Sequence, residues 1–327
     1  MAVVALTSIK GSPGVTSAAL VLAAVWPRPV VLLEADLAGG DLAFRAQAAS
    51  GGPVHSTKGL LTLASRVRGG GSVDPRVLME QSQMLACGVS LIRGVTSAAQ
   101  ARGLSWLWPN IAAACVNADV DVIVDLGRVD RASDVMELVK KADYLLPVAS
   151  TSLESVMHLT EGLQDLMGTL SHAGVRNVAP LLVGDQAHAA RDASDLDGLL
   201  GRAGLPVMST LSLPTDAKAL GRLEAGEKPD GRLGRSSLIK TARVLAQSLA
   251  ARISTEDTYS TRLEDVAQGS SVAEEEQERT RANGHRPVPP PPPAPAGVQS
   301  RPGQGPEPEA TSPWIAAIRN HSEGGAR

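Results

Sequence analysis

Short runs of Val, Leu and Ile alternate with helical patterns over residues 1–253 of the chain. These runs are apolar almost throughout, which is typical of parallel strands buried on both faces. They fall at residues 3–7, 30–34, 89–92, 120–125, 144–148, 179–183 and 207–211. Because parallel neighbours need a long crossover between them, the alternation predicts an α/β fold with a doubly wound, mainly parallel sheet.

Helical stretches lie between most of these runs, and a last one closes the domain. They are expected over residues 15–25, 74–86, 104–118, 132–141, 152–173, 193–203 and 236–252. Aromatic residues make up only 2% of the chain, so we expect a core of Ala, Val and Leu. The two cysteines, Cys87 and Cys115, have neither a disulfide framework nor metal spacing, and we expect both to be buried apolar side chains.

The composition changes near residue 253, where polar and charged residues and then prolines take over. We expect three parts: a P-loop-like domain over 1–253, a disordered polar and proline-rich linker over 254–312, and a short amphipathic recognition helix over 313–320. Trp314, Ile315 and Ile318 share one face of that helix. With one basic residue and few apolar anchors, the helix is expected to bind a protein partner rather than a membrane.

The net charge of −3 gives no global basic field that would recruit nucleic acid or an acidic membrane. The best candidates for a local DNA contact are Arg232, Arg235, Lys240 and Arg243. Neither a secretion signal nor an apolar run of about 20 residues is visible. We therefore expect a cytoplasmic protein, which a partner can recruit to membrane-associated machinery.

Residues 8–17 read SIKGSPGVTS and join the first expected strand to the first expected helix. Glycines such as Gly11 and Gly14 let backbone N–H groups converge on phosphate oxygens, and the helix that follows presents its positive end. Thr16 stands where a phosphate-binding loop supplies a hydroxyl to Mg²⁺. Val15 stands where that loop has the lysine that reaches the β- and γ-phosphates. The sequence leaves open whether such a loop still binds a nucleotide.

The loop resembles the deviant Walker A motif of the MinD/ParA family of P-loop ATPases, written KGGxGK[TS][TS], in a degenerate form. Lys10 matches the early lysine of that motif, which in the family reaches across a dimer to the nucleotide of the partner. The resemblance covers residues 1–252 and implies a homodimer, with ATP and Mg²⁺ as cofactors. It implies these nucleotide-binding residues in the loop: Lys10, Gly11, Ser12, Gly14, Val15, Thr16 and Ser17.

Two carboxylates follow expected strands at positions that this family uses for its chemistry. Asp36 resembles the switch I aspartate that orders the attacking water and the metal shell, while Glu34 replaces the family's first aspartate. Asp125 resembles the Walker B aspartate, which holds Mg²⁺ through water. The resemblance thus implies Thr16, Asp36 and Asp125 as metal-site residues, and Asp36 and Lys10 as catalytic residues.

The expected base-binding residues lie late in the domain. Pro214 and Asp216 resemble the Pro-x-Asp loop that lies beside the base in the MinD/ParA family. Asp185 stands where the family has an asparagine that reads adenine. Its carboxylate can accept a hydrogen bond from the adenine amino group.

Within the family, the segments 34–43 and 126–128 are most similar to the CpaE/TadZ-type localisation proteins. This resemblance implies a positioning or scaffold protein that binds ATP with weak or no hydrolysis and recruits pilus, secretion or division machinery. The alternative is an active partitioning-type ATPase that drives DNA or complex segregation, with Lys10 doing the work of the lost lysine. Arg128 is a second candidate for that compensation. The sequence leaves ATPase activity open.

Overall fold

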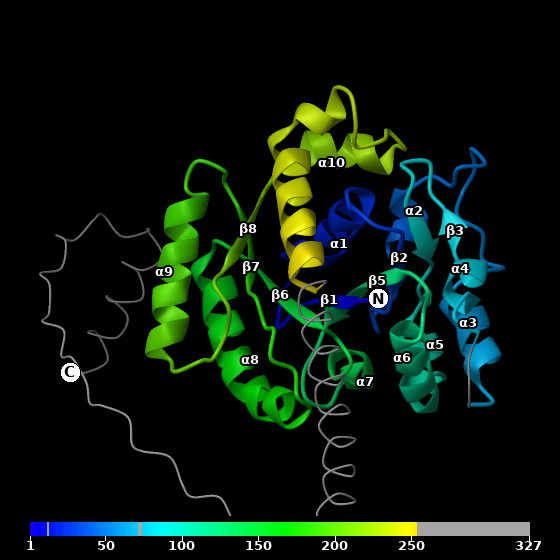
Figure 1. Ribbon diagram of the computed structural model, residues 1–327, viewed down its shortest axis with the longest axis horizontal. Coiled ribbons are helices and arrows are strands. Elements are labelled where there is room, and N and C mark those ends of the chain that lie inside the picture. Colours follow the sequence, from blue (N-terminus) through cyan, green and yellow to red (C-terminus); the bar gives the residue numbers. More distant parts are fainter. Residues whose placement is uncertain (12, 71–73, 254–327) are drawn as a thin grey trace, which may run out of the picture. The chain divides into compact units, whose positions relative to one another are not determined.

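The computed structural model describes residues 1–11, 13–70 and 74–253, and within them it contains an eight-stranded sheet (Figure 1). The strand order is β3-β4-β2-β5-β1-β6-β7-β8, and neighbouring strands are parallel except β3 and β4. The strands are β1 (Val3–Ser8), β2 (Val30–Glu34), β3 (Gln83–Met84), β4 (Ser90–Ile92), β5 (Asp121–Arg128), β6 (Tyr144–Ser150), β7 (Leu181–Gly184) and β8 (Leu211–Pro214). The expected α/β fold with a mainly parallel sheet is confirmed.

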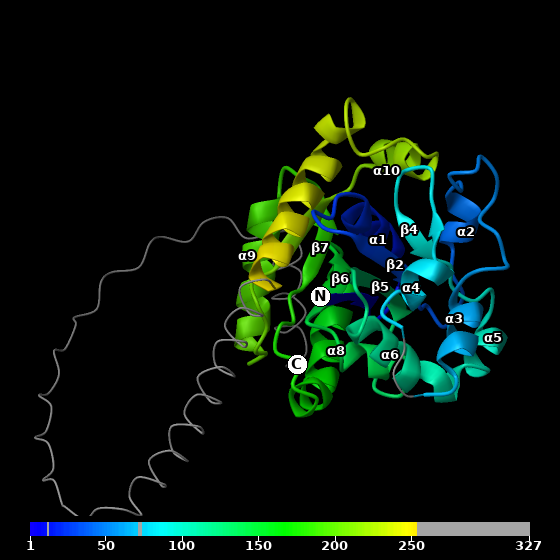
Figure 2. The ribbon, with the colours of Figure 1, turned by 45° about the vertical axis from the view of Figure 1, so that its right-hand side comes forward.

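Helices cover both faces of this sheet (Figure 2). They are α1 (Val15–Ala24), α2 (Leu42–Arg45), α3 (Leu60–Val67), α4 (Val77–Gln81), α5 (Ala98–Arg102), α6 (Trp108–Val116), α7 (Met136–Val139), α8 (Leu153–His172), α9 (Ala189–Arg202) and α10 (Ala217–Glu224), the 3-10 turns η1 (Ser105–Leu107) and η2 (Leu233–Arg235), and a final helix over 237–253. Helix α1 packs on β1, β2 and β5, while α8 packs on β6 and α9 on β7 and β8.

The central strands are buried on both faces, as their continuous apolar runs predict. In β1, Val3 and Ala5 belong to the main core cluster, which also contains residues of α3, α6, α8 and α9. The alternate residues Val4 and Leu6 are fully buried outside that cluster. Figure 2 shows α1 and the final helix on one side of the strands and α6 and α8 on the other. Both cysteines are buried, as expected.

Several elements differ from the sequence prediction. Helices α2, α3, α5 and α10 were not among the expected helical stretches, and the helix expected over 132–141 is confined to α7. The strand expected over 207–211 begins only at Leu211; just before it, Asp197 accepts hydrogen bonds from both the N–H and the hydroxyl of Thr210, at 2.7 and 2.6 Å. The helix expected over 74–86 is confined to α4, and the chain then forms the antiparallel edge strand β3. Pairing with β4, a long-range interaction, here overrides the local helical pattern.

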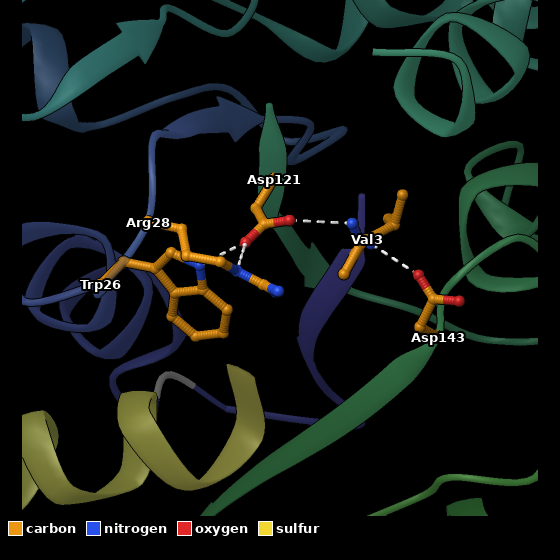
Figure 3. A network of polar contacts seen from close by, with 6 residues as sticks. Val3, Trp26, Arg28, Asp121 and Asp143 are labelled. Atoms are coloured by element: carbon orange, nitrogen blue, oxygen red, sulfur yellow. Dashed lines mark hydrogen bonds and ion pairs between the residues drawn. The ribbon is translucent and has the colours of Figure 1, made fainter. Parts of the chain in front are cut away.

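A buried carboxylate fixes the amino end of the two central strands (Figure 3). Asp121, at the start of β5, accepts hydrogen bonds from the N–H of Ala2 at 2.9 Å, from the indole N–H of Trp26 at 2.8 Å and from Nε of Arg28 at 2.7 Å. Asp143, just before β6, accepts a hydrogen bond from the N–H of Val3 at 2.7 Å. These bonds align β1 with both of its neighbours.

We expect Asp121→Ala to lower the free energy of unfolding by about 3–5 kcal/mol, because it leaves several donors at a buried position without their acceptor. The control is Asp119→Ala, since the Asp119 side chain is 45% exposed and lies 4.0 Å from Arg76; its loss is expected to stay within about 0.5 kcal/mol. Urea unfolding of the full chain measures both values. Equal losses in the two variants would contradict the role of Asp121.

Candidate functional site

The carboxyl ends of β1, β2 and β5 meet at one edge of the sheet, because these strands are parallel neighbours. In open α/β sheets, ligands bind outside this edge, where the chain turns to opposite sides of a central strand. The loops after the three strands line a polar cavity of about 730 Å³. Its lining includes the expected residues Gly11, Gly14, Val15, Thr16, Ser17 and Asp36.

The loop between β1 and α1 has the backbone form expected of an anion-binding turn. Gly11 and Gly14 have φ values of +81° and +98°, which favour glycine. Gly14 directly precedes α1, and no side chain caps the first N–H groups of that helix. These donors, with the positive end of the helix dipole, favour a negative ligand in the cavity. Ser12 lies outside the described residues.

Val15 and Thr16 begin α1 on the wall of this cavity. Val15 is 6% exposed and presents only methyl groups there. The Thr16 hydroxyl donates a hydrogen bond to the carboxylate of Asp125. The structure therefore brings together the hydroxyl and the carboxylate that the sequence assigned to the metal.

Asp125 lies at the carboxyl end of β5 and is 1% exposed. Burial raises its pKa from 3.8 to about 7; hydrogen bonds from Thr16 and from the N–H of Gly127 oppose the shift, and the negative charges of Glu34 and Asp36 add to it. The Gly127 N–H bond measures 3.1 Å. A cation beside such a buried carboxylate would favour its charged form.

Asp36 lies on the loop after β2 and lines the cavity. Its carboxylate accepts the N–H of Ala38 at 2.7 Å. Burial raises the pKa of Asp36, and the nearby Arg128 guanidinium acts in the opposite direction. Gly127 packs against it so closely that a Cβ there would lie 2.1 Å from the carboxyl carbon of Asp36. Only glycine fits at that position, where φ is +59°.

Glu34 positions the loop that carries Asp36. From the sequence it was noted only as the residue that replaces the first aspartate of the family motif. It is fully buried and accepts the N–H groups of Leu42 at 2.9 Å and of Gly94 at 3.1 Å. Burial raises its pKa. A Cβ at Gly40 would lie 2.7 Å from a Glu34 carboxylate oxygen. Glu34 thus holds the loop that carries Asp36; its signal in the sequence is a carboxylate at the end of an apolar strand.

Lys10 lies next to Gly11, which lines two cavities. It is exposed and lines a neighbouring cavity of about 460 Å³ together with Ser150, Ser152 and His158. It does not line the polar cavity with Thr16. Its expected role at the nucleotide stays a prediction.

An apolar cavity of about 250 Å³ adjoins the polar one, and the two share Gly14 and Ser17. Pro214 and Asp216, the expected base-binding residues, line it. The Asp216 carboxylate also accepts the N–H of Ala219 at 2.9 Å and so caps α10. The structure thus places this loop beside the start of α1.

Asp185 lines neither of these two cavities. Its carboxylate accepts the N–H of Ala187 at 3.0 Å and lies 3.7 Å from Nδ1 of His188. Gly184, which precedes Asp185, pairs with Pro214 and accepts the N–H of Thr215 at 2.8 Å, so Asp185 follows β7 at the same sheet edge as the Pro214–Asp216 loop. The expected contact of Asp185 with adenine stays a prediction.

The remaining expectations concern metals, membranes and the tail. Among the described residues, no group of three or more His, Cys, Asp and Glu side chains is arranged to hold a metal ion by itself. Within the same residues, no helix has the length and apolar character that a bilayer crossing requires. The linker over 254–312 and the helix expected over 313–320, with Trp314, Ile315 and Ile318, lie outside the described residues.

Solved structures with this fold include ParA- and MinD-type ATPases. A ParA family ATPase from Chlorobium tepidum matches with a TM-score of 0.59 at 20% sequence identity, over 75% of this chain and 98% of that one. MinD from Pyrococcus horikoshii, complexed with Mg-ADP, matches with a TM-score of 0.55 at 15% identity, over 76% of this chain and 95% of that one. An ATP complex of a McdA variant from Cyanothece matches with a TM-score of 0.52 at 18% identity, over 76% of this chain and 96% of that one.

At these identities the likeness establishes the fold, and the chain has the MinD/ParA-type P-loop fold. No protein-family model matches the sequence, and no curated protein is significantly similar to it.

The raised pKa of Asp125 predicts a dependence of stability on pH. The pKa of about 7 in the folded state lies above the ordinary 3.8, so folding favours the protonated carboxyl. This contribution to the free energy of unfolding is fully present below pH 3.8 and is lost as the pH rises through 7. We expect the neutral variant Asp125→Asn to gain stability over the wild type with rising pH, by about 4 kcal/mol at most.

Urea unfolding between about pH 4 and pH 8, without nucleotide or divalent metal, measures this difference. Asp119→Asn, at a half-exposed carboxylate, is the control and is expected to track the wild type. A constant difference between Asp125→Asn and the wild type across this range would show that burial does not hold the Asp125 carboxyl protonated.

Proposed function

We propose that this chain is a cytoplasmic, MinD/ParA-like positioning or scaffold protein that binds Mg-ATP with weak or no hydrolysis. The observation that carries the proposal is the pair of cavities that share Gly14 and Ser17 at the start of α1. The polar cavity, beside free helix N–H groups, suits a phosphate chain, and the apolar one suits a flat base. Together they favour a nucleotide over a simple anion.

The residues around the polar cavity also suit Mg²⁺, which prefers oxygen ligands and keeps several waters. In this proposal the Thr16 hydroxyl contacts the metal, and Asp125 and Asp36 hold its water shell. The metal supplies positive charge at the phosphates. Asp36 orients a water molecule near the terminal phosphate.

Weak hydrolysis follows from the side chains that this chain lacks at the loop. Phosphoryl transfer depends on positive groups that stabilise charge on the phosphoryl oxygens. Val15 provides none, and Lys10 lines a different cavity of the same chain. We therefore propose that nucleotide binding, rather than rapid turnover, is the functional event.

Dimerisation and partner binding complete the proposal. In this proposal the exposed Lys10 contacts a second copy that docks face to face. The segment 313–320, with Trp314, Ile315 and Ile318, would recruit the protein partner. The similar structures include a septum site-determining protein, MinD, which supports a positioning role. The CpaE/TadZ-type resemblance favours pilus or secretion machinery as the partner.

Calorimetry with Mg-ATP on the full chain tests the proposal. We expect the wild type to bind, and Asp125→Asn to lose the Mg²⁺-dependent part of the affinity because its neutral amide cannot hold the metal's waters. We expect Lys10→Ala to keep the affinity of the monomer and to reduce nucleotide-dependent dimerisation, measured by light scattering. No binding at millimolar Mg-ATP would overturn the proposal.

A second variant restores the missing charge. Val15→Lys is expected to tighten Mg-ATP binding by roughly tenfold or more, because charge-assisted bonds to phosphate contribute about 1.5–3 kcal/mol. It should also raise the rate of phosphate release. The matched control is Val15→Met, which has similar length and no charge. Equal affinities for Val15→Lys and Val15→Met would place the phosphate chain away from this loop.

The rate of ATP hydrolysis distinguishes the proposed scaffold function from that of a partitioning-type ATPase. Steady ATP hydrolysis by the wild type, abolished in Asp36→Ala, would support the partitioning role, as would salt-sensitive binding to nonspecific DNA. Localisation that survives Asp36→Ala would support the scaffold.

A further inference from the structure

The polar cavity has an unusual balance of charge for a phosphate site. Among the described residues that line it, the cationic side chains are Arg45 and Arg128, and the carboxylates are Asp36 and Asp41. Asp125 is buried and accepts a hydrogen bond from Thr16, which lines the cavity. A phosphate chain entering this cavity would therefore need a cation from the protein as well as Mg²⁺.

Arg45 holds a guanidinium group close to the first turn of α1. It is the last residue of α2, and its Nη2 donates to the hydroxyl of Ser17 at 2.9 Å. The same Nη2 forms an ion pair with Oε1 of Glu224, the last residue of α10. The side chains of Arg45 and Glu224 are 32% and 17% exposed, so the pair is partly withdrawn from water.

Arg128 is less well placed for the same role. Its side chain is exposed, and its charge acts on the carboxylate of Asp36. Arg45, in contrast, contacts the residue next to Thr16. Of the two arginines, Arg45 is therefore the one with a hydrogen bond to the first turn of α1, and it comes from a different segment of the chain.

We propose that Arg45 is the phosphate-binding cation that replaces the missing loop lysine, and that the phosphate chain displaces Glu224 from it. This inference rests on the proposed nucleotide-binding function. A guanidinium carries five N–H donors in a planar fork that matches phosphate oxygens, so it can keep Ser17 and bind phosphate together. Without ligand, Glu224 neutralises the guanidinium and competes with phosphate.

The exchange links the occupancy of the site to α10. Glu224 ends this helix, and Asp216, which caps its beginning, lines the apolar cavity. Phosphate binding would release the end of α10 from α2, while a base in the apolar cavity would contact its beginning. A ligand that occupies both cavities would thus change the position of α10.

Two variants of the pair distinguish this role from simple stabilisation. Arg45→Ala is expected to weaken the binding of Mg-ATP and of inorganic pyrophosphate by roughly tenfold or more. Glu224→Gln is expected to tighten both by a few-fold, because it frees the guanidinium. A purely structural ion pair predicts the same direction for both variants, with a matching loss of thermal stability.

A neighbouring ion pair provides the matched control. Arg222 and Glu227, on and just after α10, form a similar pair, in which Nε of Arg222 lies 2.6 Å from Oε2 of Glu227. Neither residue lines either cavity. Arg222→Ala and Glu227→Gln are expected to leave both affinities unchanged. Arg45→Lys, which keeps the charge without the fork, is expected to recover part of the binding if Arg45→Ala folds poorly.

Calorimetry on the full-length variants, with thermal unfolding as a check of folding, decides between the outcomes. Opposite effects of Arg45→Ala and Glu224→Gln support the inference. Wild-type binding of Mg-ATP that Arg45→Ala and Arg45→Lys leave unchanged overturns it and leaves the proposed function standing. Arg45-dependent binding of pyrophosphate without binding of Mg-ATP supports the role of Arg45 and overturns the proposed function. A wild type that binds neither ligand overturns both.

Discussion

The parallel pairing of β1 with β5 and β6 is the constraint on which the candidate site depends. Because β1 lies between them, the loop before α1 opens at the same edge as the end of β5. In register, Asp125 lies opposite Leu6 of β1 on one side and Glu34 of β2 on the other. The buried Asp121 at the opposite end fixes this alignment through the first residues of the chain. Hydrogen bonds to Asp121 at one edge of the sheet thus help to position Asp125 at the other edge.

The same register concentrates negative charge. Glu34, Asp36 and Asp125 come from two adjacent strand ends, and burial raises the pKa of each. Backbone N–H groups and the Thr16 hydroxyl offset part of the cost of burying these carboxylates. A bound cation would offset more of it, and a ligand that binds only the folded state stabilises that state. The site is therefore arranged to gain stability from the metal it is proposed to bind.

Valine at position 15, where a phosphate-binding loop has a lysine, changes which groups of the site can bind phosphate. With Val15 on the wall of the cavity, the loop contributes N–H groups and a hydroxyl but no side-chain charge. The positive charge comes instead from arginines of other segments, and Arg45 is held by Ser17 and Glu224. A cation supplied from α2 and shared with α10 couples the ligand to elements that a loop lysine would not touch.

The sequence by itself determined the α/β class, the buried strands and the loop that begins at Gly11, because these depend on local patterns of apolar residues and glycines. Through a family resemblance it also predicted Thr16, Asp36 and Asp125 as metal-site residues. Only the tertiary structure decided that Lys10 lines a neighbouring cavity, that β3 replaces the end of a helix, and that Arg45 reaches the cavity lined by Thr16. Those results depend on contacts between residues far apart in the chain, and such contacts leave no periodic signal in the sequence.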